Sequence, residues 1–186
     1  MNYKLEAWWF VFILALSACS GKTTTAPQTA EEPPTPSPDT PSPAQIDAPK
    51  VESPNIIVLD MFNVLDGWAV TSAEIVRTHD SGRTWYDVSP RDMTEPGYSV
   101  DAFFLDNEHA WVQKANPEKF PIGGTLYRTE DGGRGWGNFV VPFSRGDLNF
   151  VDAGHGWVMA DLGVGAGSNP VAVFQTTDGG YNWDKT

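Results

Sequence analysis

The chain has 186 residues, a formal net charge of −12 and a single cysteine. This length allows one domain with accessory segments, and the acidic balance excludes the basic surface that nucleic-acid binding requires. One cysteine excludes an intramolecular disulfide, so the folded part must be stabilised by packing. Eight Trp and ten Phe residues can supply the apolar surface for that packing.

Residues 1–18 form a predicted export signal. Lys4 lies near the start, and residues 7–18 are uncharged and mostly apolar. As a helix this run would rise only about 18 Å, too short for a hydrocarbon core of about 30 Å. It ends in Leu16-Ser17-Ala18-Cys19, which resembles the lipobox of bacterial lipoproteins. The resemblance implies acylation of Cys19, which anchors the protein to a bacterial membrane on its extracytoplasmic side. An ordinary secretory signal is the alternative.

Residues 19–54 are a predicted tether that begins with the lipidated cysteine. The stretch after Cys19 holds nine prolines among Ser, Thr and Ala, with few large apolar residues. Such a composition cannot bury enough surface to fold, and prolines favour extended conformations. We therefore expect a disordered spacer and a folded part that begins near Asn55.

Residues 55–186 are predicted to be all-β, with no convincing helix after the signal. Short strand-like runs group into three blades of four strands, at about residues 55–89, 98–141 and 147–186. The predicted strands are Asn55–Met61, Gly67–Thr71, Glu74–Arg77 and Trp85–Val88; Ser99–Leu105, Ala110–Lys114, Thr125–Thr129 and Trp136–Val141; and Leu148–Val151, Gly156–Ala160 and Val171–Thr176, with a last strand beginning at Trp183.

The frame Thr-x-Asp-x-Gly-x-x-Trp occurs three times, each time between the third and fourth predicted strands. Its Asp positions are 51 and 47 residues apart, a period typical of propeller repeats. Asp can bond its own backbone two residues on, Gly supplies a positive φ, and Trp opens the next strand with a large apolar surface. We assign a structural role to the frame residues, which are Thr78, Asp80, Gly82, Trp85, Thr129, Asp131, Gly133, Trp136, Thr176, Asp178, Gly180 and Trp183.

A second motif precedes each frame. Phe-x-Asp-x-x-x-x-Trp begins at Phe104 and at Phe150, with a degenerate copy from Met61. Together the two motifs resemble the bacterial neuraminidase repeat, or Asp-box, of sialidase-like propellers and of propellers like the photosystem II assembly and stability factors. The resemblance covers about residues 55–186 and implies a β-propeller of four-stranded blades. It is specific for the fold but not for one function, because Asp-boxes occur in glycosidases and in binding propellers alike.

Three predicted blades are fewer than the four to eight of a closed propeller. Apolar faces between blades and a strand edge would therefore be exposed. Two explanations remain open: the sequence is a fragment of a longer reading frame, or another copy closes the propeller by self-association. The interrupted third blade favours the fragment, because we expect an evolved oligomer to end at a blade boundary.

The predicted binding surface lies at the end of the blades opposite the Asp-boxes. In a four-stranded meander, the 2–3 loops and the blade connections share that end, and loops on a rigid scaffold often carry binding. For each residue in them, a plain solvated loop position is the alternative. The candidates for recognition of a protein or a glycan are Arg91, Tyr98, Lys114, Lys119, Phe120, Arg145 and Asp161.

We expect no catalytic residue, metal or cofactor in this chain. Resemblance to sialidases would require three clamping arginines, a Tyr with a nearby Glu, and an acid/base Asp. Arg77 and Arg128 occupy equivalent repeat positions, which indicates a role within the blades. His109 and His155 are also equivalent and favour turn roles over metal ligation.

The expected function is non-catalytic binding or scaffolding by a membrane-anchored lipoprotein, with a protein or a cell-surface glycan as ligand. The alternative is a fragment of a sialidase-like glycoside hydrolase whose catalytic residues lie outside this chain.

Overall fold

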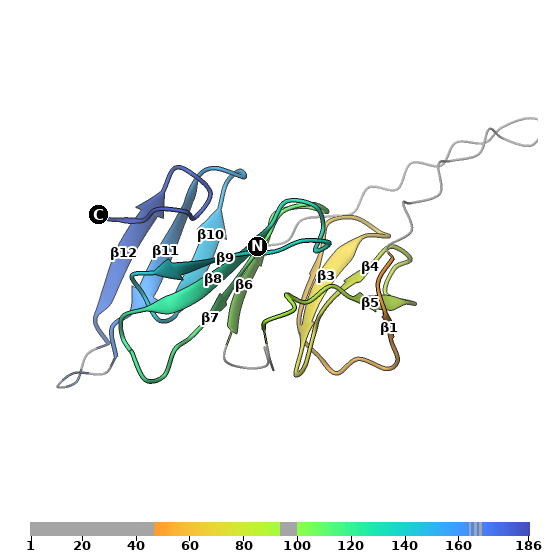
Figure 1. Cartoon of the computed structure of the whole chain (residues 1–186), viewed down its shortest axis with the longest axis horizontal. Coiled ribbons are helices and arrows are strands. Elements are labelled where there is room, and N and C mark those ends of the chain that lie inside the picture. The colour runs from red at the N-terminus through yellow and green to blue at the C-terminus, as the bar shows by residue number, and fades with distance from the viewer. Residues whose placement is uncertain (1–46, 94–99, 164, 166, 168) are drawn as a thin grey trace, which may run out of the picture. The chain divides into compact units, whose positions relative to one another are not determined.

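The computed structural model describes residues 47–93, 100–163, 165, 167 and 169–186. These residues form strands, turns and loops, with no helix among them, and their strands make three antiparallel sheets (Figure 1). The all-β prediction is therefore confirmed. None of the described residues forms a helix that could span a membrane. The predicted signal, Cys19 and most of the predicted tether lie outside the described residues.

Four strands of each sheet form a meander in which successive strands are neighbours, and the first sheet has one additional strand at its edge. The first sheet contains β1 (Lys50–Val51), β2 (Ile56–Met61), β3 (Gly67–Thr71), β4 (Ile75–Thr78) and β5 (Trp85–Asp87), in the order β1-β5-β4-β3-β2. The second contains β6 (Val100–Phe104), β7 (Ala110–Lys114), β8 (Gly124–Thr129) and β9 (Gly137–Val141). The third contains β10 (Gly146–Phe150), β11 (Gly156–Asp161), β12 (Val171–Thr176) and β13 (Asp184–Lys185).

Strand β1 lies inside the stretch predicted as tether, and the prediction is wrong there. Lys50 and Val51 pair with Tyr86 and Trp85 of β5, which makes the first sheet five-stranded. Val51 also packs against the buried cluster that contains Trp85. Pairing starts before Asn55 because the free edge of β5 and the Trp85 ring offer both hydrogen-bonding groups and apolar surface.

The other predicted strands are present with small shifts at their ends. Glu74, predicted in a strand, lies in the tight turn before β4. The hydroxyl of Thr71 donates to the Glu74 carboxylate at 2.6 Å and accepts the amide N–H of Glu74 at 2.7 Å. These local bonds compete with the sheet ladder for the same backbone groups, so the strand begins one residue later, at Ile75.

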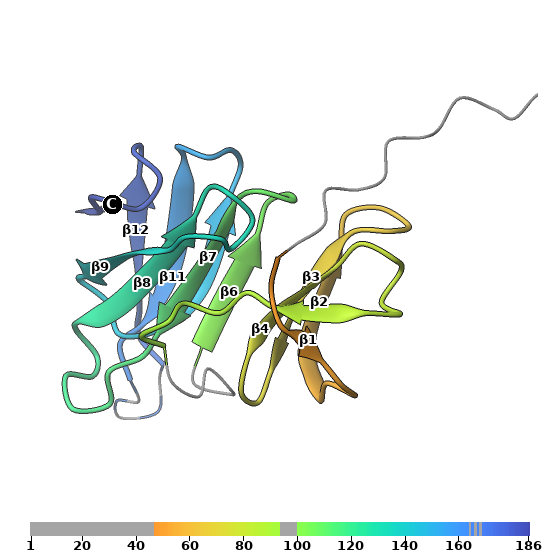
Figure 2. The same cartoon turned by 45° about the vertical axis from the view of Figure 1, so that its right-hand side comes forward.

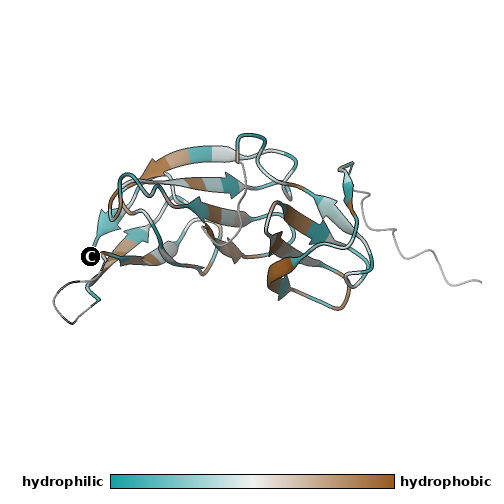
Figure 3. Ribbon diagram, turned by 90° about the horizontal axis from the view of Figure 1, so that it is seen from below, coloured by the Kyte–Doolittle hydropathy of each residue, from teal (hydrophilic) through white to brown (hydrophobic). Residues whose placement is uncertain are grey.

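Successive residues in the strands face opposite sides of each sheet, and hydrophobic and hydrophilic segments alternate along the ribbon (Figure 3). In β7, Ala110 and Val112 face the first sheet, whereas Trp111 faces the third. Both faces of the second sheet are therefore buried against a neighbour. This two-sided burial explains why the first three residues of β7 are all apolar.

Two clusters of buried side chains join the sheets face to face (Figures 1 and 2). Aromatic stacking is central to each: Trp68 lies on Phe104 with ring centroids 5.3 Å apart, and Trp111 lies on Phe150 at 3.8 Å. Between the first and second sheets the cluster contains Trp68, Val70, Ile75, Val88, Met93, Phe104, Ala110, Val112 and Tyr127. Between the second and third it contains Trp111, Leu126, Val141, Phe143, Leu148, Phe150, Val158 and Ala160.

Candidate functional site

The three Asp-box turns share one hydrogen-bond network, in which Thr and Asp hold the backbone. Thr78, Thr129 and Thr176 each accept the amide N–H of the frame Gly on the side-chain oxygen, at 2.9 Å in all three copies. Each of these hydroxyls also donates to the carboxylate of the frame Asp, at 2.9–3.0 Å. The repeat is therefore conserved within the chain at the level of individual atoms.

The predicted bond from the frame Asp to the residue two positions on is wrong. Asp80 accepts the amide of Thr84, four positions on, at 2.8 Å, and Asp178 accepts that of Asn182 at 2.9 Å. The intervening glycines cause this geometry. Gly179 and Gly180 have φ values of 77° and 100°, which reverse the chain and bring the later amide over the carboxylate.

These bonds stabilise the charged carboxylates. Desolvation raises the pKa of Asp80, but hydrogen bonds from Thr84 and Thr78 outweigh it, so that the pKa lies below its ordinary value. The pKa of Asp178 is lowered in the same way, where the side chain and backbone of Asn182 outweigh desolvation. Carboxylates saturated by their own turn have little capacity left for a ligand, which supports the structural role assigned to the frame.

The Asp-box turns dock on the turns between the first two strands of their sheets. Gly132 donates its amide to the Glu108 carbonyl at 3.0 Å, and Gly179 donates to the Gly154 carbonyl at 2.7 Å. Both kinds of turn therefore share one end of the sheets, as predicted. His109 has a turn role at this end, with Nδ1 3.0 Å from the Asp106 carboxylate.

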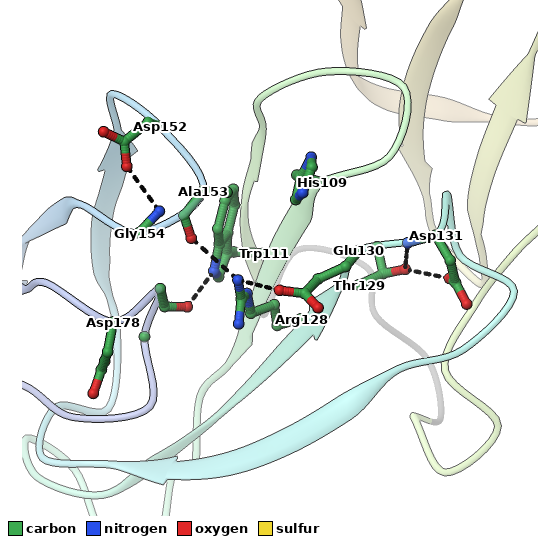
Figure 4. A network of polar contacts seen from close by, with 12 residues as sticks. His109, Trp111, Arg128, Thr129, Glu130, Asp131, Asp152, Ala153, Gly154 and Asp178 are labelled. Carbon is green, nitrogen blue, oxygen red and sulfur yellow. Dashed lines mark hydrogen bonds and ion pairs between the residues drawn. The ribbon is translucent and has the colours of Figure 1, made fainter.

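The arginines that precede the Asp-boxes bridge neighbouring sheets. Arg77 donates to the Gly132 carbonyl at 2.9 Å, and Arg128 donates to the Ala153 carbonyl at 3.1 Å. Figure 4 shows Arg128 between Ala153 and Glu130, with which it also forms an ion pair. Desolvation lowers the pKa of Arg77 to about 10, so the guanidinium keeps its charge at neutral pH. Both residues therefore have a structural role, in which they link one sheet to the next.

At the opposite end, three of the predicted binding residues come together. Arg145 donates from Nε to the Asp161 carboxylate at 2.8 Å and from a terminal nitrogen to the same oxygen. Its guanidinium also lies over the Phe120 ring, 5.0 Å from the centroid. Since the side chain of Arg145 is 57% exposed, one side of the charged group is accessible from solvent.

Arg145 and Asp161 line a recess of about 320 Å³ at the mouth between the second and third sheets. Asp101 of β6 lines it as well and accepts the Gly146 amide at 3.1 Å. Asp101 is not among the predicted binding residues, because its place inside a predicted strand gives no local signal of a site. Its position near the start of β6 could have indicated a role in the site, since that end of the strand lies next to the loops. The remaining lining residues are Gly146, Asp147, Met159, Asn169 and Val171.

Two of the three carboxyl groups that line the recess have pKa values shifted in opposite directions. Desolvation raises the pKa of Asp101. The pKa of Asp161 is lowered by the Gly163 amide and by Arg145. The charged form is therefore less favoured at Asp101 than at Asp161.

Two of the other predicted binding residues line recesses of their own. Lys119 lines a separate apolar recess with Ile122 and Val141, and Lys114 lies half-buried at the end of β7. Arg91 lines a third recess with residues 133–136 of the second Asp-box turn, so the prediction that places it at the opposite end is wrong. Tyr98 lies outside the described residues.

Within the described part of the chain, no group of three or more His, Cys, Asp or Glu side chains is arranged to hold a metal ion. Comparison with protein-family models, with curated proteins and with solved structures finds no match. The resemblance to Asp-box propellers thus rests on the repeat motifs, and the functional argument rests on the geometry above.

Proposed function

We propose that the three sheets are blades of an Asp-box β-propeller, carried by a lipoprotein that Cys19 anchors to a bacterial membrane on its extracytoplasmic side. Three meanders with equivalent turns and equivalent inter-sheet bonds support the propeller. The lipobox-like Leu16–Cys19 sequence supports the anchor. Membrane attachment would hold the blades within reach of envelope components.

The propeller acts as a non-catalytic binding or scaffolding module for a protein or a cell-surface glycan. One observation carries this proposal: Phe120 and Arg145, from two separate loops, meet Asp161 at the end of β11 beside one recess. An aromatic ring, an exposed guanidinium and carboxylates supply the apolar and polar contacts that recognition sites combine. The Asp-box end offers turns whose frame Thr and Asp side chains are already paired with each other.

Binding to bacterial envelope preparations tests the proposal. We expect the full chain to bind, and Arg145→Ala to weaken binding at least about tenfold, equivalent to about 1.4 kcal/mol. Arg83→Ala is the matched control, because Arg83 lies in an Asp-box turn and donates only to the carbonyl of Asp80. Protease treatment of the envelopes would abolish binding to a protein, and periodate would abolish binding to a glycan. Equal binding by Arg145→Ala and the unchanged chain would contradict the proposal.

The opposed pKa shifts of Asp101 and Asp161 raise a second candidate that differs from the predicted alternative, namely a glycosidase whose acid and base lie in this recess and not outside this chain. Glycosidases use a carboxylic acid and a carboxylate in different environments. Turnover of a fluorogenic glycoside by the full chain, lost in Asp101→Asn, would favour this alternative over plain binding.

A further inference from the structure

The second Asp-box turn departs from the other two at the residue before the frame Trp. This residue is Thr84 in the first copy and Asn182 in the third, but it is Gly135 in the second. Asn182 donates from Nδ2 to the second carboxylate oxygen, Oδ2, of Asp178 at 2.7 Å. Gly135 has no side chain and cannot supply such a bond to the frame Asp of its own turn.

Asp131 therefore keeps one carboxylate oxygen that its turn does not use. The hydroxyl of Thr129 and the amide of Gly135 both bond Oδ1, at 2.9 Å each. No residue in the described part of the chain bonds Oδ2. A Cβ built at Gly135 would lie 3.2 Å from Oδ2, so this oxygen lies beside the position where the other copies carry a side chain. The carboxylate of Asp131 can accept a further hydrogen bond there.

Asp131 and Gly135 line a recess of about 380 Å³ between the second and third sheets at the Asp-box end. Gly137 lines it as well, at a position where the other two copies carry Tyr86 and Asp184. The recess is thus bordered by glycine at two positions that hold side chains in the other copies. This difference sets the second turn apart from two turns that are otherwise alike.

Two aromatic rings form the apolar wall of the recess. Phe139 and Tyr181 pack edge to face, with ring centroids 4.6 Å apart. The Phe139 ring also lies against Gly137, where a Cβ would be 3.0 Å from it. Tyr181 is 50% exposed. A partly exposed ring that its neighbours already hold in place offers apolar surface to a ligand at a small cost in conformational entropy.

The polar wall of the recess carries charges of both signs. Arg128 lines it with the guanidinium 5.0 Å from the centroid of the Tyr181 ring, and this group forms an ion pair with Glu130. A cationic ligand would therefore be repelled by Arg128, and an anionic ligand would be repelled by Glu130 and Asp131. The charges favour a neutral ligand that can donate a hydrogen bond to the unused oxygen of Asp131.

We propose that this recess binds a neutral sugar residue of a glycan, at a site separate from the recess at the loop end. One sugar hydroxyl donates to Oδ2 of Asp131. A C–H face of the sugar ring packs on the aromatic wall at Tyr181. Sugars fit both walls, because a hydroxyl is donor and acceptor at once and the ring carbons present an apolar face.

Ligand-observed NMR titration of the full chain, in a detergent without a sugar headgroup, tests the class of ligand. The neutral probes are the methyl glycosides of glucose, galactose, mannose and N-acetylglucosamine. We expect saturable binding of at least one of them. The cationic probe glucosamine and the anionic probe methyl glucuronide should bind at least about tenfold more weakly. No binding of any neutral probe, or equal or tighter binding of a charged one, would overturn the proposal.

Gly135→Asn tests the place of binding, because it introduces the side chain that the third copy has. The new amide should bond Oδ2 of Asp131, as Asn182 bonds Asp178, and the affinity for the neutral glycoside should fall at least about tenfold. The melting temperature should not fall with it, since Gly135 has no positive φ that requires glycine. Equal affinity of Gly135→Asn and the unchanged chain would overturn the proposed site.

Tyr181→Ala tests the aromatic wall and should also weaken binding at least about tenfold. Arg134→Ala is the matched control, because Arg134 stands at the equivalent position of the second Asp-box turn and lines a different recess. It should bind the glycoside as the unchanged chain does. Weaker binding in both variants, or in neither, would contradict the proposal. Arg145→Ala should leave this binding unchanged, so the loop-end recess and this site are tested separately.

Discussion

At the residue scale, the frame Thr and Asp form a set of hydrogen bonds within a single turn. In the first copy, Thr78 and Asp80 bond each other, and each also accepts a backbone amide of the turn. Bonds to a charged acceptor contribute more than neutral ones, about 1.5–3 kcal/mol in typical cases. These hydrogen bonds explain why the frame recurs with the same residue types, because each of them either forms one of the bonds or supplies a backbone angle that the turn requires.

The lowered pKa of Asp80 predicts a pH dependence with a definite sign. Its folded pKa lies below the unfolded value of about 3.9, so its stabilising contribution is present above about pH 4 and lost as pH falls through the folded pKa. Between pH 6 and pH 3, the unfolding free energy should fall further in the unchanged chain than in Asp80→Asn. Urea unfolding at the two pH values measures the difference. An identical fall in both chains would contradict the prediction.

At the element scale, the Asp-box turn is both a hairpin and a docking element. Gly179 has a φ of 77°, and a Cβ built there would lie 2.5 Å from the Ala153 carbonyl and 2.7 Å from Arg128. The turn therefore needs glycine both for its backbone angle and for the close approach of the neighbouring turn and sheet.

A comparison of Gly179→Ala with Gly167→Ala separates the cost of the backbone angle from the cost of crowding by neighbouring atoms. Gly167 also has a positive φ, of 88°, but nothing lies within 4 Å of a Cβ there. We expect about 1–2 kcal/mol of destabilisation from the backbone angle at either site. Gly179→Ala should add about 1–3 kcal/mol from overpacking. Thermal and urea unfolding measure both variants, and equal destabilisation would show that crowding at Gly179 is relieved without cost.

At the scale of the whole molecule, the sheets are held together by the same groups at both interfaces. Stacked aromatic pairs supply apolar burial, and the Trp and Arg donors satisfy carbonyls of the adjacent turns. These bonds join one sheet to the next. Their loss should therefore make the sheets unfold less cooperatively and should also lower the total free energy of unfolding.

Arg128→Met tests this coupling, because it keeps an apolar side chain of similar length and removes the donors. The Ala153 carbonyl would lose its Arg128 donor, and the expected destabilisation is about 1–3 kcal/mol. Hydrogen exchange in β11 and β12 should increase with it. Arg134→Met is the control, since Arg134 is exposed and bonds only within its own turn, and it should change stability by less than about 0.5 kcal/mol. Faster exchange in both variants would contradict a specific role for Arg128.

The amino-acid sequence by itself determined the all-β class, the positions of the hairpins and the structural role of the Asp-boxes. These features depend on short-range chemistry: alternation along a strand, positive φ at Gly82, Gly133 and Gly180, and side-chain bonds within one turn. Local periodicity contains this information because the residues that interact are close in sequence.

Only the tertiary structure decided which of the predicted binding residues meet. Phe120, Arg145 and Asp161 are brought together by the stacking of two sheets, whereas Arg91 lines a different recess. The pairing of β1 with β5 likewise depends on an edge that exists only after the first sheet has formed. These contacts join positions far apart in the chain, and their geometry is set by side-chain packing between sheets, which no local pattern records.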